Sequence, residues 1–74
     1  MRLPKVPIVS AKRLVAALKR LGFHEARQRG SHLQLERGSL LATVPMHPGS
    51  LDPRVLRSIL RQARVSVEQI RDAL

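Results

Sequence analysis

Two of the three Gly-Ser pairs in this chain limit its possible fold more than any other feature. They stand at 30–31 and 38–39, and the six residues 32–37 lie between them. Glycine followed by a small polar residue is typical of tight turns, because glycine adopts backbone angles that other residues avoid. The spacing predicts a short strand at 32–37 with antiparallel neighbours at 23–29 and 40–45, joined as a meander.

The strand predicted at 32–37 alternates between apolar and polar side chains. Leu33 and Leu35 share one face, and His32, Gln34 and Glu36 share the other. Because successive side chains of a strand point to opposite faces, burying the two leucines places His32 on the polar face. His32 is there a candidate for proton transfer, since histidine gains and loses a proton near neutral pH. An exposed strand histidine without a chemical role remains the alternative.

The two neighbouring strands have less regular patterns. In 23–29 we expect the charged residues on one side and the smaller or uncharged ones on the other. The first set is Glu25, Arg27 and Arg29, and the second is Ala26 and Gln28. The segment 40–45 is mostly apolar and ends at Val44-Pro45, because proline cannot donate a hydrogen bond to a sheet.

Polar capping residues predict three helices. Ser10 is a favourable cap for a helix at 11–21, and Asp52-Pro53 begins a second helix. Ser66 opens a capping box, which predicts a short third helix at 67–73. The apolar spacing of the second helix predicts a buried face made of Val55, Leu56, Ile59, Leu60 and Ala63.

The order of these elements predicts a small α+β fold, in which helices pack on one face of a three-stranded antiparallel sheet. A chain of 74 residues is long enough for one domain, which we expect at 10–74 after a flexible, proline-containing arm at 1–9. The chain has no cysteine and no apolar run long enough to cross a membrane. We therefore expect a soluble cytoplasmic protein that does not associate with membranes.

The charge of the chain is strongly positive, at +9. Arg54, Arg57, Arg61 and Arg64 recur along one side of the second helix, and Asp52 is the only acidic residue between Arg37 and Arg64. Such a row favours a polyanion, or an acidic protein, as partner. The chain has one aromatic residue, so it lacks the stacking platforms that many single-strand binders use.

The remaining residue types restrict the chemistry. The five acidic residues are scattered along the chain, and the three histidines, at 24, 32 and 47, do not have metal-ligand spacing. We therefore expect no metal site and no cofactor. Ser31 beside His32 is not a catalytic triad, because adjacent strand residues point to opposite sides.

RNA cleavage needs little more than this chain offers. The nucleophile is the 2′-hydroxyl of the substrate, so the protein has to move protons and to stabilise charge on the phosphate. His32 is suited to proton transfer, and arginine supplies planar donors for phosphate oxygens. The candidate RNA-binding residues are Arg27, Arg29, Arg54, Arg57 and Arg61. DNA, which lacks the 2′-hydroxyl, should be bound without being cut.

Four segments together resemble the HicA toxin family of bacterial toxin–antitoxin modules. They are Gly22-Phe23, Arg29-Gly30-Ser31-His32, Val44-Pro45-x-His47 and the segment 56–63, which reads Leu-Arg-Ser-Ile-Leu-Arg-Gln-Ala. The resemblance implies a fold similar to the double-stranded-RNA-binding domain and a metal-independent mRNA endoribonuclease that blocks translation. It also implies a HicB-type antitoxin partner that covers the active histidine, with His32 as the catalytic residue and Gly30 and Ser31 as its supporting turn.

The chain departs from the family pattern in three places. Pro53-Arg54-Val55-Leu56 stands where the second helix usually begins with Gly-Thr-Leu or Gly-Ser-Leu, so a cation lies where the family has no side chain. Arg64 stands at a position that usually carries glycine, and the turn at 38–39 is shorter than usual. None of these changes affects His32, but the first could alter contacts with RNA or with a partner.

Two other functions remain open from the residues alone. One is a non-catalytic module of the same fold that binds double-stranded RNA, and the other is a domain that docks on an acidic protein. A non-catalytic RNA-binding module should be little affected by replacement of His32, whereas a nuclease should lose turnover. A domain that docks on an acidic protein should bind RNA weakly, whereas the affinity of an RNA binder should fall steeply as salt rises. His47 is a possible site residue, with packing against the start of the second helix as its alternative role.

Overall fold

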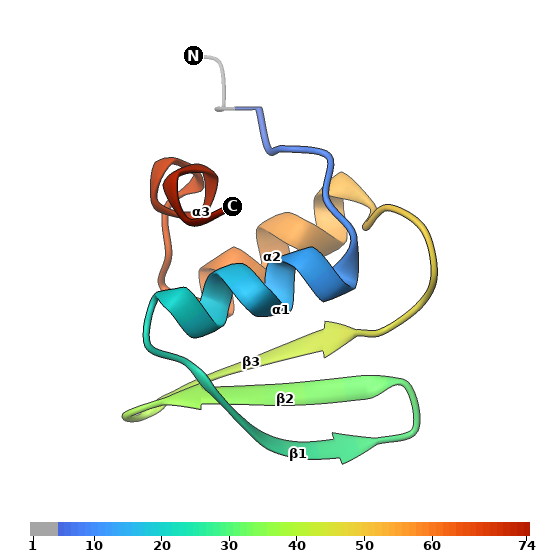
Figure 1. The fold of residues 1–74 in the computed structure, drawn as a ribbon, viewed down its shortest axis with the longest axis vertical. Coiled ribbons are helices and arrows are strands. Elements are labelled where there is room, and N and C mark those ends of the chain that lie inside the picture. Colours follow the sequence, from blue (N-terminus) through green and yellow to red (C-terminus); the bar gives the residue numbers. More distant parts are fainter. Residues whose placement is uncertain (1–4) are drawn as a thin grey trace.

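The computed structural model describes residues 5–74. In chain order its elements are α1 (Ala11–Arg20), β1 (His24–Arg29), β2 (His32–Arg37), β3 (Leu40–Pro45), α2 (Pro53–Ala63) and α3 (Val67–Ala73). Figure 1 shows the three strands as one layer, with the helices gathered on one side of it. This arrangement confirms the predicted α+β class with a three-stranded antiparallel sheet.

The sheet buries one face only. Leu33 lies opposite Val44, and Leu35 lies opposite Ala42, and all four side chains are buried beneath the helices. Helices α1 and α2 contribute further apolar residues to the same core, among them Leu14, Leu18, Leu56 and Ile59. The clean alternation of β2 therefore sets the orientation of the whole sheet, because a shift by one residue would expose both leucines.

The strand β1 corrects one prediction. Its pairing with β2 is interrupted between Glu25 and Arg27, where an extra residue, Ala26, is inserted as a bulge. The bulge reverses the faces of the residues before it, so Glu25 lies on the same side as Gln28, and Arg27 and Arg29 lie on the other. The prediction that Glu25 shares a face with the two arginines is wrong for this reason.

The helix boundaries follow the predicted caps. The side chain of Ser10 accepts from the N–H of Arg13, and that of Asp52 accepts from the N–H of Arg54. The capping box at Ser66 is complete, and α3 spans the predicted residues. Helix α1 ends one residue before the predicted position, with Leu21 as its C-cap.

One residue expected in the core of α2 lies at the surface. Val55 is 37% exposed, whereas the other four residues of the predicted face are buried. Val55 is in the first turn of α2, where the helix leaves the loop, and the core begins with Leu56. The prediction for Val55 is wrong because helical spacing does not show where a helix end extends beyond the sheet.

The residues before α1 contact the rest of the domain. Val9 is buried, its carbonyl oxygen accepts from the N–H of Leu51, and the Arg71 side chain contacts the carbonyl oxygen of Lys5. The first four residues of the predicted arm lie outside the described residues, and the boundary at residue 10 stays a prediction. In the described part of the chain, no helix is long and apolar enough to cross a membrane.

Candidate active site

His32 is the first residue of β2, and its side chain is exposed on the face of the sheet that the helices leave open. Gln34 and Glu36 follow it on that face, as the alternation predicts. Its strand is the central one of three, so a neighbouring strand supports it on each side. The imidazole is therefore presented to solvent from a rigid element.

The pairing pattern shows how the backbone of His32 is held. The N–H of Thr43 donates to the side chain of Gln62 on α2, at 3.1 Å, so this N–H points away from β2. Thr43 and its partner Gln34 therefore form a pair without mutual backbone hydrogen bonds, and alternation makes His32 and Pro45 another such pair. Proline fits this position without the loss of a hydrogen bond, because no N–H is needed there. The backbone N–H and carbonyl groups of His32 point towards β1.

The turn before His32 contains the two residues expected to support it. Gly30 has φ of +55°, Ser31 has a negative φ, and no atom lies within 4 Å of the position that a Gly30 Cβ would occupy. Glycine is therefore required by the backbone angle and not by close packing. The carbonyl oxygen of Ser31 accepts from the N–H of Met46 at 2.6 Å, which continues the ladder between β2 and β3 beyond His32.

Two arginines of β1 share the open face with His32. Arg29 is the direct cross-strand partner of His32, and Arg27 is the partner of Gln34. Glu36, the acidic residue on this face of the described strands, lies four residues along β2, or about 13 Å away. It pairs with His24 at 3.7 Å. The His32 end of the open face therefore combines an imidazole with cations and lacks a carboxylate from the sheet.

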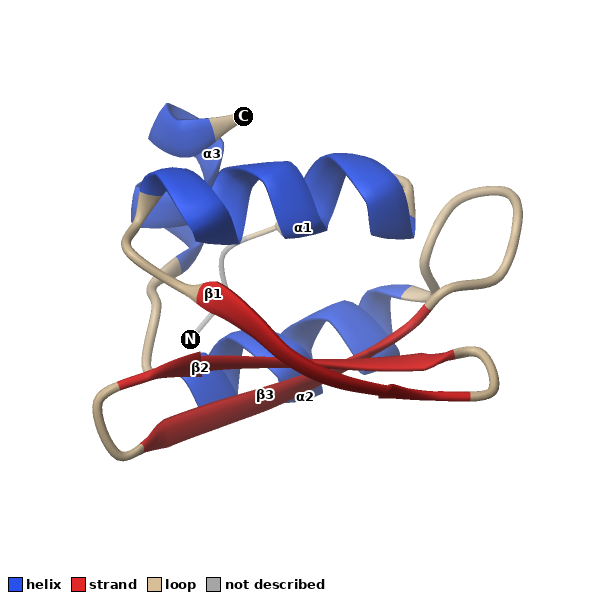
Figure 2. Ribbon diagram, turned by 60° about the horizontal axis from the view of Figure 1, so that its bottom comes forward, coloured by secondary structure: helices blue, strands red, loops and turns tan. Residues whose placement is uncertain are grey.

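The arginine row of α2 begins at the same end of the molecule. Figures 1 and 2 show the β1–β2 turn, the β3–α2 loop and the first turns of α1 and α2 at one end of the domain. Arg54 is in that first turn of α2 and is exposed, and Arg57 is half-buried. Arg61 lies about 10 Å from Arg54 along the helix axis. Helix α1 has no acidic residue in its first turn, so the positive end of its dipole remains available to anions, whereas the carboxylate of Asp52 caps the positive end of α2.

His47 lies in the loop that leaves β3 beside His32. It is two residues beyond Pro45, the cross-strand partner of His32, and its side chain is exposed. The bond from Met46 to Ser31 ties the start of this loop to the β1–β2 turn. His47 thus belongs to the same end of the domain as His32 and is not packed into the core.

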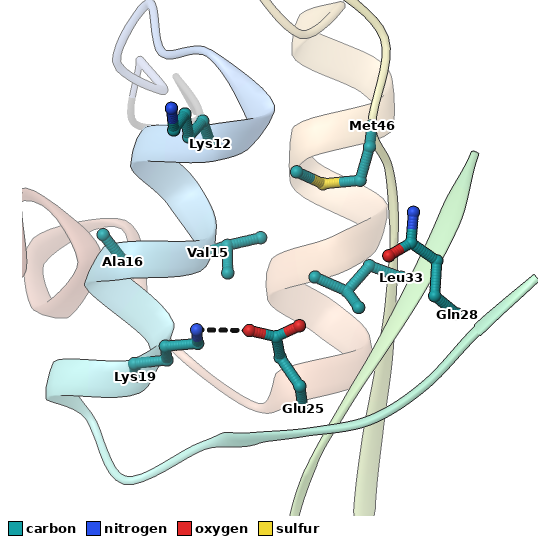
Figure 3. Close-up of a pocket in the computed structure, with 8 residues that line it drawn as sticks. All are labelled: Lys12, Val15, Ala16, Lys19, Glu25, Gln28, Leu33 and Met46. Atoms are coloured by element: carbon teal, nitrogen blue, oxygen red, sulfur yellow. Dashed lines mark hydrogen bonds and ion pairs between the residues drawn. The ribbon is translucent and has the colours of Figure 1, made fainter. Parts of the chain in front are cut away.

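A groove between α1 and the sheet was not expected from the sequence. It has a volume of about 410 Å³ and is lined by Lys12, Val15, Ala16 and Lys19 of α1 and by Glu25, Gln28, Leu33 and Met46 (Figure 3). We call it the α1 groove. The bulge at Ala26 places Glu25 on the helix side of the sheet, at the groove, where its carboxylate pairs with Lys19. In the sequence, the irregular alternation of side-chain types within 23–29 was the one indication of this feature.

The chemistry available at this end is proton transfer and anion binding. No three histidine, aspartate or glutamate side chains within residues 5–74 come close enough to share a metal ion. What the described residues at this end do offer is the exposed imidazoles of His32 and His47, two arginines on the same sheet face as His32 and a row of arginines that leads away along α2. These features define a small basic α+β protein with a surface suited to binding anions.

The comparison with known families agrees with this description. The family described as HicA toxin of bacterial toxin-antitoxin matches residues 11–65, which include every strand, α1 and α2. The chain therefore belongs to the HicA toxin family and is a toxin of a toxin–antitoxin module, with an antitoxin as its partner. A search of curated proteins found no match.

Proposed function

We propose that this toxin is a metal-independent endoribonuclease that cleaves mRNA, with His32 as its proton-transfer group. The observation that carries the proposal is the exposure of His32 on the open sheet face, opposite Arg29 and beside a turn that projects no side chain from Gly30. A histidine placed there is accessible to a ribose hydroxyl, and it is held by pairing on both sides of its strand.

The reaction balances with groups that the substrate and the protein supply. The substrate 2′-oxygen attacks the adjacent phosphorus as His32 accepts its proton, and the bond from phosphorus to the 5′-oxygen breaks. The departing 5′-oxygen takes up a proton from water, His32 later returns its proton to solvent, and the products are a 2′,3′-cyclic phosphate and a 5′-hydroxyl. Arg27 and Arg29 lie on the same face, where they can bind the phosphate oxygens on which charge accumulates.

The arginines of α2 have a separate part in this proposal. Arg54, Arg57 and Arg61 bind flanking phosphates and hold the strand, because a row of planar donors matches a line of phosphates. The antitoxin partner is then a HicB-type protein that covers His32 and so keeps the nuclease inactive in the cytoplasm. The part assigned to the arginines rests on the position of their side chains along α2, and the HicB-type partner rests on membership of the family.

The test is expression of the wild-type protein and of His32→Ala while the decay of total mRNA is followed. Wild type should arrest growth and shorten mRNA half-lives, whereas His32→Ala should do neither and yet bind RNA with unchanged affinity. In vitro, cleavage should fall by about 10²–10⁴-fold, the range for loss of general acid–base catalysis. A DNA strand of the same sequence should be bound without being cut.

The rival function is a non-catalytic module that binds double-stranded RNA. It predicts that His32→Ala behaves as wild type in every assay, and that duplex RNA is preferred over single strands. Equal growth arrest by the two proteins would contradict the catalytic assignment of His32.

A further inference from the structure

We infer that the α1 groove binds one unpaired nucleobase of the RNA, and that it prefers a base with an exocyclic amino group, such as adenine or cytosine, over uracil. This inference rests on the proposed function, because it assigns a specificity site to the same substrate. The groove is separate from the arginines considered above, and none of its lining residues has a part in the proton transfer assigned to His32.

The α1 groove adjoins the turn that precedes His32. Leu33 follows His32 directly in the chain, Met46 donates its N–H to Ser31, and the side chain of Gln28 donates to the carbonyl oxygen of Gly30 at 3.2 Å. Three groove residues therefore adjoin the turn that carries His32. Because His32 and Leu33 point to opposite faces, the groove lies across the sheet from the imidazole.

This position favours a single strand. A strand that passes over the β1–β2 turn can place a phosphodiester at His32 and the neighbouring base on the other face, in the groove. A duplex cannot do so, because its bases are stacked and paired, whereas unpaired bases can be turned outwards one at a time.

The walls of the α1 groove include an apolar surface. Val15 and Leu33 are 7% and 5% exposed and form an apolar floor, onto which the thioether of Met46 also projects (Figure 3). An apolar, polarizable surface of this kind packs against the flat face of a base. The volume of about 410 Å³ is in the range of small-molecule sites.

Beside its two lysines, the groove contains two side chains that offer acceptors, Gln28 and Glu25. The amide nitrogen of Gln28 is directed to Gly30, which leaves the side-chain oxygen of Gln28 to accept from a ligand. The Glu25 carboxylate is a second acceptor, although it is shared with Lys19. Acceptors bind the amino groups of adenine and cytosine and are mismatched with the carbonyl groups of uracil.

The rim of the α1 groove carries a positive charge. Lys12 lies at the entrance on α1, is exposed, and forms no ion pair within residues 5–74, whereas Lys19 pairs with Glu25. A free ammonium group at the mouth of an apolar groove is suited to the phosphate attached to a buried base.

The experiment measures binding of short oligoadenylate, oligocytidylate and oligouridylate to His32→Ala protein by fluorescence anisotropy. Oligoadenylate and oligocytidylate should bind about tenfold more tightly than oligouridylate, a difference expected for one well-placed base contact. Ala16→Trp, which fills the groove from α1, should abolish this preference. Lys12→Gln should weaken the binding of all three oligonucleotides by a similar factor. Arg13→Gln removes the same charge outside the groove and should leave the three affinities unchanged.

A second variant guards against misfolding of Ala16→Trp. Gln28→Ala changes an exposed side chain and should remove the preference for amino-bearing bases while the circular dichroism spectrum is unchanged. Equal affinity for the three oligonucleotides, or a preference that survives both Ala16→Trp and Gln28→Ala, would overturn the inference. A wild-type protein that fails to cut RNA would refute the proposed nuclease but not the base preference, since binding is measured without catalysis.

Discussion

The backbone N–H of Met46 donates to the carbonyl oxygen of Ser31 over 2.6 Å, and this bond joins the turn before His32 to the loop that contains His47. It lies one residue beyond the pair formed by His32 and Pro45. The strand ladder thus extends past the histidine, so the backbone that carries the imidazole is braced on both sides. A proton-transfer group needs such a support, because a small displacement from the substrate hydroxyl lowers the rate.

The two Gly-Ser turns provide a matched pair of mutations. Gly30 and Gly38 have φ of +55° and +58°, and a Cβ added at either position would meet no atom within 4 Å. Gly30→Ala and Gly38→Ala should each lower the free energy of unfolding by about 1 kcal/mol, since both force alanine into the left-handed region. Only Gly30→Ala should also reduce RNA cleavage. Urea denaturation and a cleavage assay on both variants check this, and equal loss of activity would show that the turn has no special part.

The C-cap of α2 offers a stabilising mutation. Arg64 has φ of 54° and ψ of 42°, the left-handed conformation that glycine usually provides at a helix end. Arg64→Gly should raise the free energy of unfolding by about 0.5–1 kcal/mol, because the relief of strain exceeds the greater freedom of glycine in the unfolded chain. Arg61→Gly, within the last turn of the same helix, should destabilise the protein. A stability loss for Arg64→Gly in urea denaturation would contradict the conformational account.

The contact between α2 and the edge of β3 can be tested by hydrogen exchange. The side-chain oxygen of Gln62 accepts from the N–H of Thr43, and its amide nitrogen donates to the hydroxyl of Ser58 at 3.3 Å. Gln62→Ala should increase the exchange rate of the Thr43 amide and cost about 1 kcal/mol of stability. Ser58→Ala, which removes only the second bond, should have a smaller effect on the same amide. Unchanged exchange in Gln62→Ala would show that the bond is not formed in solution.

The arginine row predicts a specific salt dependence. If Arg54 and Arg61 each bind one phosphate of a single strand, their replacement by Gln should reduce the slope of log K against log salt by about 1.4. The measurement is anisotropy of a labelled RNA with His32→Ala protein at several salt concentrations. Arg20→Gln is the control, because the Arg20 side chain donates to the carbonyl oxygen of Ala73 at the opposite end of α1. A slope unchanged by the double mutation would exclude the row from the RNA site.

The sequence was most informative where one regular pattern decided the structure. Alternation in β2 placed His32 on the open face because exposing Leu33 and Leu35 would cost several kcal/mol of lost burial. The caps at Ser10, Asp52 and Ser66 indicated the helix starts, because each satisfies a backbone donor locally. These features depend on neighbours in the chain, which a single sequence displays.

The features that were missed depend on contacts between distant residues. The bulge at Ala26 is set by the register of β1 on β2, and the segment 23–29 alone fits either arrangement of Glu25. The α1 groove joins residues from Lys12 to Met46, and no local pattern brings these together. The exposure of Val55 likewise depends on how far the sheet extends under α2.

The bond from Thr43 to Gln62 has a consequence for self-association. The sheet has two outer strands, and on β3 the outward-pointing N–H of Thr43 is occupied by the Gln62 side chain of α2. The border of β1 is left open, protected only by its charged side chains and its bulge. Addition of a strand from another copy along β3 would have to displace the Gln62 side chain from the N–H of Thr43, so this border is a poor template for strand pairing.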